Sequence, residues 1–253
     1  MKPSIKFIAH RGESEVAPEN TVEAYALAWR NGAAWGAETD VYLTTDGVLV
    51  CNHDGDLNRV AGVDMVLREH TYAEIREHEV GAWKAPQWYG CKTPALWEVY
   101  ASMPREAHIY VEIKSAGEGF ITAHEEARLA GGVDKSQITF ISFFIDELKF
   151  VKANMPEYRT LLLRWANNVD GTLVPSAADI LVELKEYGFD GVDFGCPVGM
   201  LTRDYVQEVK DAGFEFHMWT INDLDMALEF TSYGVDSITT DAPARLAREL
   251  KAR

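Results

Sequence analysis

The chain has 253 residues, of which 47% are hydrophobic, and its formal net charge is −16. The hydrophobic content is enough to bury a large core, which argues against an intrinsically disordered chain. The strong negative charge argues against a nucleic-acid partner, because surfaces that follow a phosphate backbone are basic. It does not argue against a small anionic substrate, provided that the binding site itself carries positive charge.

The chain also carries few signals for export or for a membrane. The N-terminus has too few apolar residues for a signal-peptide core, and no apolar run is long enough to cross a bilayer. The three cysteines, Cys51, Cys91 and Cys196, are odd in number and far apart, which suits a reducing compartment. We therefore expect a cytoplasmic protein without stable membrane insertion, while nothing in the sequence indicates its oligomeric state.

Strands and helices are predicted to alternate along most of the chain. Strands are expected at residues 6–9, 35–43 with a continuation at 48–52, 109–114, 138–144, 160–165, 191–194, 214–221 and 237–240. The first helix is opened by Asn20 or Thr21 and stopped at Asn31-Gly32. Later helices are expected at residues 94–103, 119–130, 146–154, 177–187, 202–212, 224–233 and 243–251.

This alternation predicts parallel βαβ units. Eight strands close a TIM (β/α)8 barrel, and a chain of this length is typical of one. We expect residues 1–253 to form a single catalytic barrel domain, with residues 55–92 as a small, mostly polar insertion after the second strand that contains a helix at 72–78. An open doubly wound sheet is the alternative, but no GxGxxG motif follows the first strand.

Polar residues with catalytic potential fall at the ends of the predicted strands, where a βα barrel carries its active site. His10 and Arg11 end the first strand, Glu38 and Asp40 share one face of the second, and His53 ends its continuation. Each of these short patterns alone is more often an ordinary hydrogen-bonded loop or a solvated ion pair. Their occurrence at successive strand ends favours one functional site.

Glu112 and Lys114 share a face at the end of the third strand and complete the set. Carboxylates that converge at a barrel mouth repel one another unless a cation balances them, and hard oxygen ligands suit Mg²⁺ or Ca²⁺. A divalent cation beside Arg11 and Lys114 would bind a phosphate. Two histidines near that phosphate can share proton transfer, because imidazole titrates near neutral pH.

Several longer motifs resemble the glycerophosphodiester phosphodiesterase family over essentially the whole chain. They are HRG, PENT, ETD, TTDGVLVCNHDGDLNR, TPALWEV, VEIK, MWTIN and TTDAP, in that order. The resemblance implies a TIM-barrel hydrolase that uses a divalent cation to cleave small-molecule glycerophosphodiesters to glycerol 3-phosphate and an alcohol. It also implies a cyclic phosphate intermediate, which the sequence does not establish.

The resemblance also implies a role for each candidate residue. His10 and His53 would be the acid–base pair. The metal ligands would be Glu38, Asp40 and Glu112. The substrate would contact Arg11, Lys114, Phe143 and Trp219. The headgroup preference, the native metal and the histidine that acts first as base stay open.

Other aromatic and histidine residues have less certain roles. Trp83, Trp88 and Tyr89 could line the mouth, although packing within the insertion is favoured, and His217 is expected to be a hydrogen-bonded core residue. The remaining histidines are expected at the surface: His70, His78, His108 and His124.

Three alternative functions remain. The same site could act on a lysophospholipid or a phosphoinositide-type substrate, which an accessible apolar rim around Trp83 and Trp88 would favour. A different metal-dependent barrel enzyme, such as an aldolase or isomerase, has less use for two histidines beside an arginine. A non-catalytic ligand-binding barrel has no need of both histidines together with three carboxylates.

Overall fold

The computed structural model describes residues 5–117 and 119–253, and its central feature is a closed parallel barrel. The sheet has nine strands in the order β1-β11-β10-β9-β6-β5-β4-β2-β3, and β1 also pairs with β2. Only β3 is antiparallel to its neighbour, so the other eight strands form the ring. These eight are β1 (Phe7–His10), β2 (Gly36–Leu43), β4 (His108–Ile113), β5 (Ile138–Ser142), β6 (Arg159–Trp165), β9 (Gly191–Gly195), β10 (Glu215–Met218) and β11 (Ser237–Thr240). The predicted TIM barrel is confirmed.

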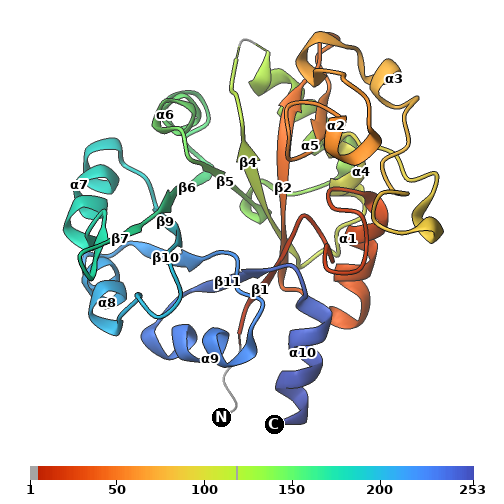
Figure 1. Cartoon of the computed structure of the whole chain (residues 1–253). Helices are drawn as coiled ribbons and strands as arrows, with labels where there is room; N and C mark the ends of the chain where they lie inside the picture. The colour runs from red at the N-terminus through yellow and green to blue at the C-terminus, as the bar shows by residue number, and fades with distance from the viewer. Residues whose placement is uncertain (1–4, 118) are drawn as a thin grey trace.

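Helices surround the outer face of the strands (Figure 1). They are α1 (Val22–Trp29), α4 (Leu96–Ala101), α5 (Phe120–Gly131), α6 (Ile145–Asn154), α7 (Ala177–Tyr187), α8 (Arg203–Asp211), α9 (Leu224–Tyr233) and α10 (Pro243–Ala252). Local sequence explains their ends: the Thr21 hydroxyl accepts a hydrogen bond from the Ala24 amide, and Gly188 ends α7 at φ +71°. The main core lies between strands and helices, where Val111, Phe140 and Val192 are completely buried.

The inside of the barrel holds a smaller apolar cluster. Its buried members are Ile8, Tyr110, Ile141, Leu161 and Leu163. Because side chains alternate along a strand, the neighbours of these residues face the helices instead. This cluster forms the base beneath the polar residues at the mouth.

The insertion after β2 differs in detail from the prediction. β2 turns back into the antiparallel β3 (Leu49–Cys51), followed by short helices at α2 (Asn58–Ala61), η2 (Leu67–Glu69), α3 (Tyr72–Ile75) and η3 (Pro86–Trp88). The helix predicted at 72–78 is therefore only four residues long. A separate cluster that includes Leu57, Leu67 and Ile75 packs this segment. Two further 3-10 turns are η1 (Arg30–Gly32) and η4 (Lys135–Gln137).

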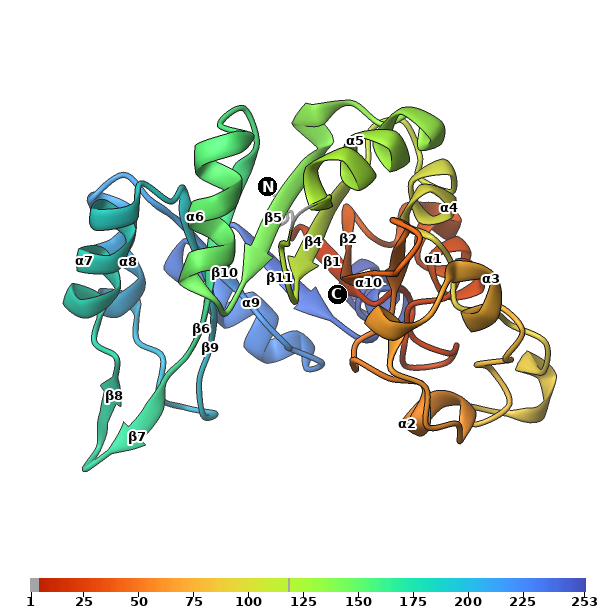
Figure 2. The same cartoon turned by 90° about the horizontal axis from the view of Figure 1, so that it is seen from above.

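A second hairpin was not predicted. β7 (Asn167–Val169) and β8 (Thr172–Val174) form it after β6, around Asp170 and Gly171, both at positive φ. An Asp-Gly turn of this kind is a common hairpin signal, so the sequence did contain the information. Figure 2 shows this hairpin and α2 projecting to the same side of the barrel, the lower side of that view.

Three expectations about strand ends and histidines were wrong. The strands predicted at 138–144 and 214–221 end at Ser142 and Met218, which leaves Phe143 and Trp219 in the following loops. His124 lies on α5 and is fully buried rather than exposed, because Tyr100, Phe120, Phe140 and Tyr158 enclose its ring. None of the helices in the described ranges is long and apolar enough to cross a membrane.

Candidate active site

The corner between β1 and α1 presents the first two polar side chains. Gly12 has φ +86°, and a Cβ atom there would lie 2.6 Å from Ala24, so only glycine fits. This tight turn places Arg11 in the left-handed region at φ +56°, with its backbone amide donating to Glu38 Oε2 at 3.1 Å. His10 lies opposite Glu38 in the register of β1 and β2.

The register of the next strand pair brings three carboxyl groups together. Asp40 on β2 lies opposite Glu112 on β4, and Glu38 is two residues before Asp40 on the same face. Carboxylate oxygens of all three lie within 4.8 Å of one another, and all three residues are buried. The predicted grouping of Glu38, Asp40 and Glu112 is therefore present in the fold.

Two cations and an amide contact this cluster. Lys114 Nζ lies 2.8 Å from Asp40 Oδ1 and 2.6 Å from Glu112 Oε1. Arg11 Nε lies 3.2 Å from Asp40 Oδ2, which also accepts a hydrogen bond from Asn20 Nδ2 at 2.9 Å. Asp40 thus has positive charge on two sides.

The three carboxyl groups differ in acidity because their neighbours differ. Burial opposes ionisation of Asp40, but Lys114 and Arg11 outweigh it and hold the pKa of Asp40 below its usual value. Burial, and then the charge of Asp40, raises the pKa of Glu38 well above its usual value and that of Glu112 to about 7. Asp40 therefore stays ionised, while burial favours the protonated form of Glu38 and Glu112 titrates near neutral pH.

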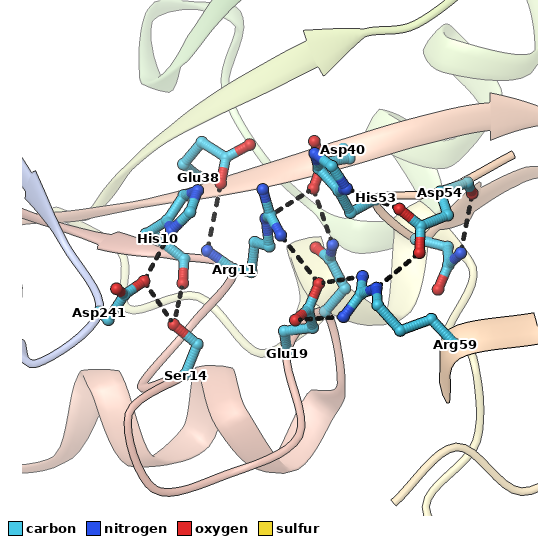
Figure 3. A network of polar contacts seen from close by, with 12 residues as sticks. His10, Arg11, Ser14, Glu19, Glu38, Asp40, His53, Asp54, Arg59 and Asp241 are labelled. Carbon is cyan, nitrogen blue, oxygen red and sulfur yellow. Dashed lines mark hydrogen bonds and ion pairs between the residues drawn. The ribbon is translucent and has the colours of Figure 1, made fainter. Parts of the chain in front are cut away.

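Both candidate histidines are held by a carboxylate at Nδ1 (Figure 3). His10 Nδ1 lies 2.7 Å from Asp241 Oδ1, and His53 Nδ1 lies 2.9 Å from Asp54 Oδ1. Burial alone would raise the pKa of Asp241, but the hydrogen bond with His10 lowers it to about 2. Burial lowers the pKa of His53, so the ring is neutral at neutral pH. A carboxylate at Nδ1 favours the tautomer that leaves Nε2 available for proton exchange.

Further charged residues tie these elements together in the same network. Arg59 Nε donates to Asp54 Oδ2 at 2.6 Å, and both Arg59 and Arg11 donate to Glu19 (Figure 3). The insertion, the β1–α1 loop and the barrel are therefore linked through one chain of ion pairs.

A pocket of about 170 Å³ opens above these residues. It is lined by His10, Arg11, Glu38, His53, Glu112, Ile141, Phe143, Leu163, Asp193, Trp219 and Thr239. The ring centroids of Phe143 and Trp219 lie 5.5 Å apart in an edge-to-face arrangement on the apolar side. The structure thus brings these two predicted substrate residues to the same pocket as the histidines. Asp40 and Lys114 lie next to the pocket, not on its surface.

The other predicted aromatic and histidine residues lie elsewhere. Trp83 donates its ring N–H to Val80 O and Trp88 donates to Val16 O, so both pack the insertion and the loop beside it. His217 is buried inside the barrel, where Ser237 Oγ and Glu215 Oε2 contact its two ring nitrogens.

Sequence reasoning missed three polar residues of the site. Asp241 and Asn20 belong to the TTDAP and PENT motifs, in which Asn20 was predicted only as a possible helix cap and Asp241 was given no role. Asp193 lines the pocket from β9, and the GVDF segment offered no signal beyond a charged residue inside a buried strand.

With this geometry in hand, the comparisons with known proteins identify the family. The profile of the "Glycerophosphoryl diester phosphodiesterase family" matches residues 10–245. The chain belongs to this family. It is therefore a phosphoric diester hydrolase on a TIM barrel.

Individual relatives agree with this assignment. A glycerophosphodiester phosphodiesterase of Bacillus subtilis (strain 168) is 29% identical over 93% of this chain and 83% of its own length. One from Caldanaerobacter subterraneus subsp. tengcongensis is 28% identical over 94% of this chain and 95% of its own. The structure of an Oleispira antarctica phosphodiesterase in complex with the product sn-glycerol-3-phosphate superposes with a TM-score of 0.84 at 27% identity, covering 98% of this chain and 97% of that one.

Proposed function

We propose that this protein hydrolyses glycerophosphodiesters to glycerol 3-phosphate and an alcohol, with a divalent cation and with His10 and His53 as the proton carriers. The observation that carries the proposal is the convergence on one pocket of two carboxylate-supported histidines, an arginine and a buried group of three carboxyl residues. The product complex of the Oleispira antarctica relative supports the substrate class.

The carboxyl cluster fits a hard divalent cation such as Mg²⁺ or Ca²⁺. Glu38 Oε1 is buried without a hydrogen-bond partner in the described residues, as expected of an oxygen reserved for a ligand. Glu38, Asp40 and Glu112 would hold the ion and supply only oxygen donors. When bound, such a cation neutralises charge on a phosphoryl oxygen and lowers the pKa of a coordinated hydroxyl.

The protein's own side chains would bind the phosphate, transfer protons and enclose the glycerol. Arg11 places a guanidinium at the pocket, where it binds a phosphate oxygen, and Lys114 adds positive charge behind the carboxylates while fixing Asp40 and Glu112. Nε2 of one histidine takes the proton of the attacking oxygen, which belongs to water or to the glycerol 2-hydroxyl, and Nε2 of the other gives a proton to the leaving alcohol oxygen. Attack by the 2-hydroxyl gives a cyclic phosphate, which water then opens to glycerol 3-phosphate. Phe143 and Trp219 enclose the carbon atoms of the glycerol and keep water out of that side of the pocket.

A second candidate substrate is a lysophospholipid, and one observation favours it. Large apolar side chains are exposed at the ends of β5 and β6, where Phe143 lines the pocket and Phe144 and Trp165 follow the strands. Trp165 lies 5.7 Å from Trp219 between ring centroids, so this rim continues the apolar wall of the pocket. It lies on the other side of the mouth from Trp83 and Trp88, where such a rim was expected.

A cytoplasmic location stays a prediction. Cys51, Cys91 and Cys196 are free thiols, which is compatible with a reducing compartment.

The test is an assay of the purified protein on glycerophosphocholine, glycerophosphoethanolamine and a lysophosphatidylcholine. We expect release of glycerol 3-phosphate from the first two, and a ~10²–10⁴-fold loss of kcat in His53→Ala because general acid–base assistance is removed. His78→Ala, which changes a partly exposed histidine of the insertion, is the matched control and keeps wild-type turnover. Wild-type turnover in His53→Ala would remove that residue from the mechanism. Release of lysophosphatidic acid, without glycerol 3-phosphate, would identify the lysophospholipid as the substrate.

A further inference from the structure

Asp193 is a buried carboxyl residue at the pocket that the mechanism above does not use. It lies in the middle of β9, is 3% exposed, and its Oδ1 has no hydrogen-bond partner among the described residues. Its side chain nevertheless lines the same pocket as His10 and Trp219. A buried acceptor without a partner destabilises a fold, so its presence needs a compensating use.

The neighbours of Asp193 do not supply that use. His217 is its partner in the register of β9 and β10, but Ser237 and Glu215 already contact both nitrogens of His217. Trp219 Nε1 donates to the backbone carbonyl of Asp193 at 3.0 Å and not to its side chain. Leu163, the register partner on β6, and Ile141 are apolar. The carboxyl group, which lines the pocket, is therefore left for a molecule bound there.

The barrel order places Asp193 opposite the phosphate side of the site. β9 is four strands from β2 in either direction around the ring, so Asp193 faces the carboxylate cluster across the mouth. A phosphate held by Arg11 and a cation on the β1–β2 side would direct the rest of the substrate toward β9. The glycerol of a glycerophosphodiester ends in a hydroxyl group, which is a hydrogen-bond donor.

We propose that Asp193 recognises the terminal hydroxyl of the glycerol and so selects glycerol diesters over diesters of alcohols that lack it. The proposal rests on the proposed function and names a specificity residue within that site. Burial raises the pKa of Asp193 to about 7, so the carboxyl group can also donate a hydrogen bond when it is protonated. Either form pairs with a hydroxyl, which both donates and accepts.

The test compares two substrates and two variants. The second substrate is the phosphocholine diester of propane-1,2-diol, which keeps the hydroxyl beside the phosphoester carbon and lacks the terminal one. We expect the wild type to prefer glycerophosphocholine at least tenfold in kcat/KM, because a site built around a hydroxyl leaves a buried group unpaired with the deoxy analogue. In Asp193→Leu this preference falls to within about twofold, and Asp193→Asn, which retains an acceptor oxygen, lies between them.

Thermal unfolding separates this role from a structural one. Because Oδ1 has no internal partner, Asp193→Leu and Asp193→Asn should keep or raise Tm, whereas a structural role would lower it. Asp204→Ala, which changes an exposed aspartate on α8, is the control and leaves both the preference and Tm unchanged. An unchanged preference in Asp193→Leu overturns the proposal, as does a lowered Tm together with equal losses on both substrates.

A binding measurement distinguishes failure of the proposal for Asp193 from failure of the proposed function. If the wild type hydrolyses neither diester, calorimetry with sn-glycerol 3-phosphate and with inorganic phosphate still tests Asp193. Weaker binding of glycerol 3-phosphate but not of phosphate in Asp193→Leu supports the assignment, and equal affinities for both proteins contradict it.

Discussion

His10 and His53 are each held by a carboxylate, which comes from a distant part of the chain for His10 and from the adjacent residue for His53. Asp241, which holds His10, is 231 residues away in sequence, whereas Asp54 is the next residue after His53. Ser14 Oγ and Asn222 Nδ2 also donate to Asp241, at 3.0 and 2.6 Å, and so fix the carboxylate itself. In the proposed mechanism Asp241 is a positioning residue, because it would act on the reaction through His10.

Replacing Asp241 tests this positioning. We expect Asp241→Asn to lower kcat about tenfold to hundredfold, because the amide can turn its NH₂ toward Nδ1 and favour the wrong tautomer, with Tm nearly unchanged. The pH–rate profile, which a merely structural role would leave unchanged, is the second readout. The control is Asp225→Asn, which removes a surface partner of Arg253. An unchanged kcat and pH profile in Asp241→Asn would show that His10 does not need this support.

At the scale of elements, the register of β1, β2 and β4 assembles the site. The pairs His10–Glu38 and Asp40–Glu112 follow from two parallel ladders, each one strand from the next. Strand alternation alone was sufficient to predict that these side chains share the mouth. The β7–β8 hairpin was not predicted, although its Asp170-Gly171 turn is a local signal, and the early end of β5 was missed because loop geometry rather than the apolar pattern determined it.

On α5, the burial of His124 was not predicted. His124 was expected on the surface because its helical stretch reads as polar, yet Tyr100 Oη contacts its Nε2 at 3.0 Å inside an aromatic cage. Burial lowers the pKa of His124 to about 4. The Tyr100 hydroxyl pairs with only one ring nitrogen of His124, and Nδ1 lies 3.5 Å from Glu125 Oε1 without a hydrogen bond.

This burial gives a pH dependence of stability. The unfolded chain protonates His124 below about pH 6.5, and the folded chain does so only near pH 4. The histidine therefore lowers the free energy of unfolding as the pH falls through this window. Above the window it has no effect. In His124→Gln the slope of this free energy against pH, measured by urea titration between pH 4.5 and 6, should decrease by about 1.4 kcal/mol per pH unit.

The free energy of unfolding of His124→Gln can be higher or lower than that of the wild type. The test is therefore the slope of this free energy against pH. His78→Gln, which alters a partly exposed histidine, should keep nearly the wild-type slope. An equal slope in His124→Gln and wild type would mean that His124 titrates normally in the folded protein.

For the whole molecule, periodicity and motif spacing predicted the barrel, the position of the insertion and the grouping of both histidines with the carboxylates. Each depends on local sequence or on strand order. The support of His10 by Asp241 and the exposure of the rim around Trp165 depend on which loops meet after the barrel closes, and no local pattern encodes that. The sequence could not indicate a role for Asp193 either. Its proposed role follows from a buried oxygen that no neighbouring group pairs with in the folded protein.

The central claim is that one cation-dependent site at the barrel mouth cleaves glycerophosphodiesters. Its most direct test is release of glycerol 3-phosphate from glycerophosphocholine by the purified protein, before and after EDTA treatment and after Mg²⁺ or Ca²⁺ is added back. We predict turnover that EDTA abolishes and one of the two ions restores, because the proposed cation between Glu38, Asp40 and Glu112 would bind the phosphate beside these carboxylates. Full turnover after EDTA, or none with either ion, would contradict the claim.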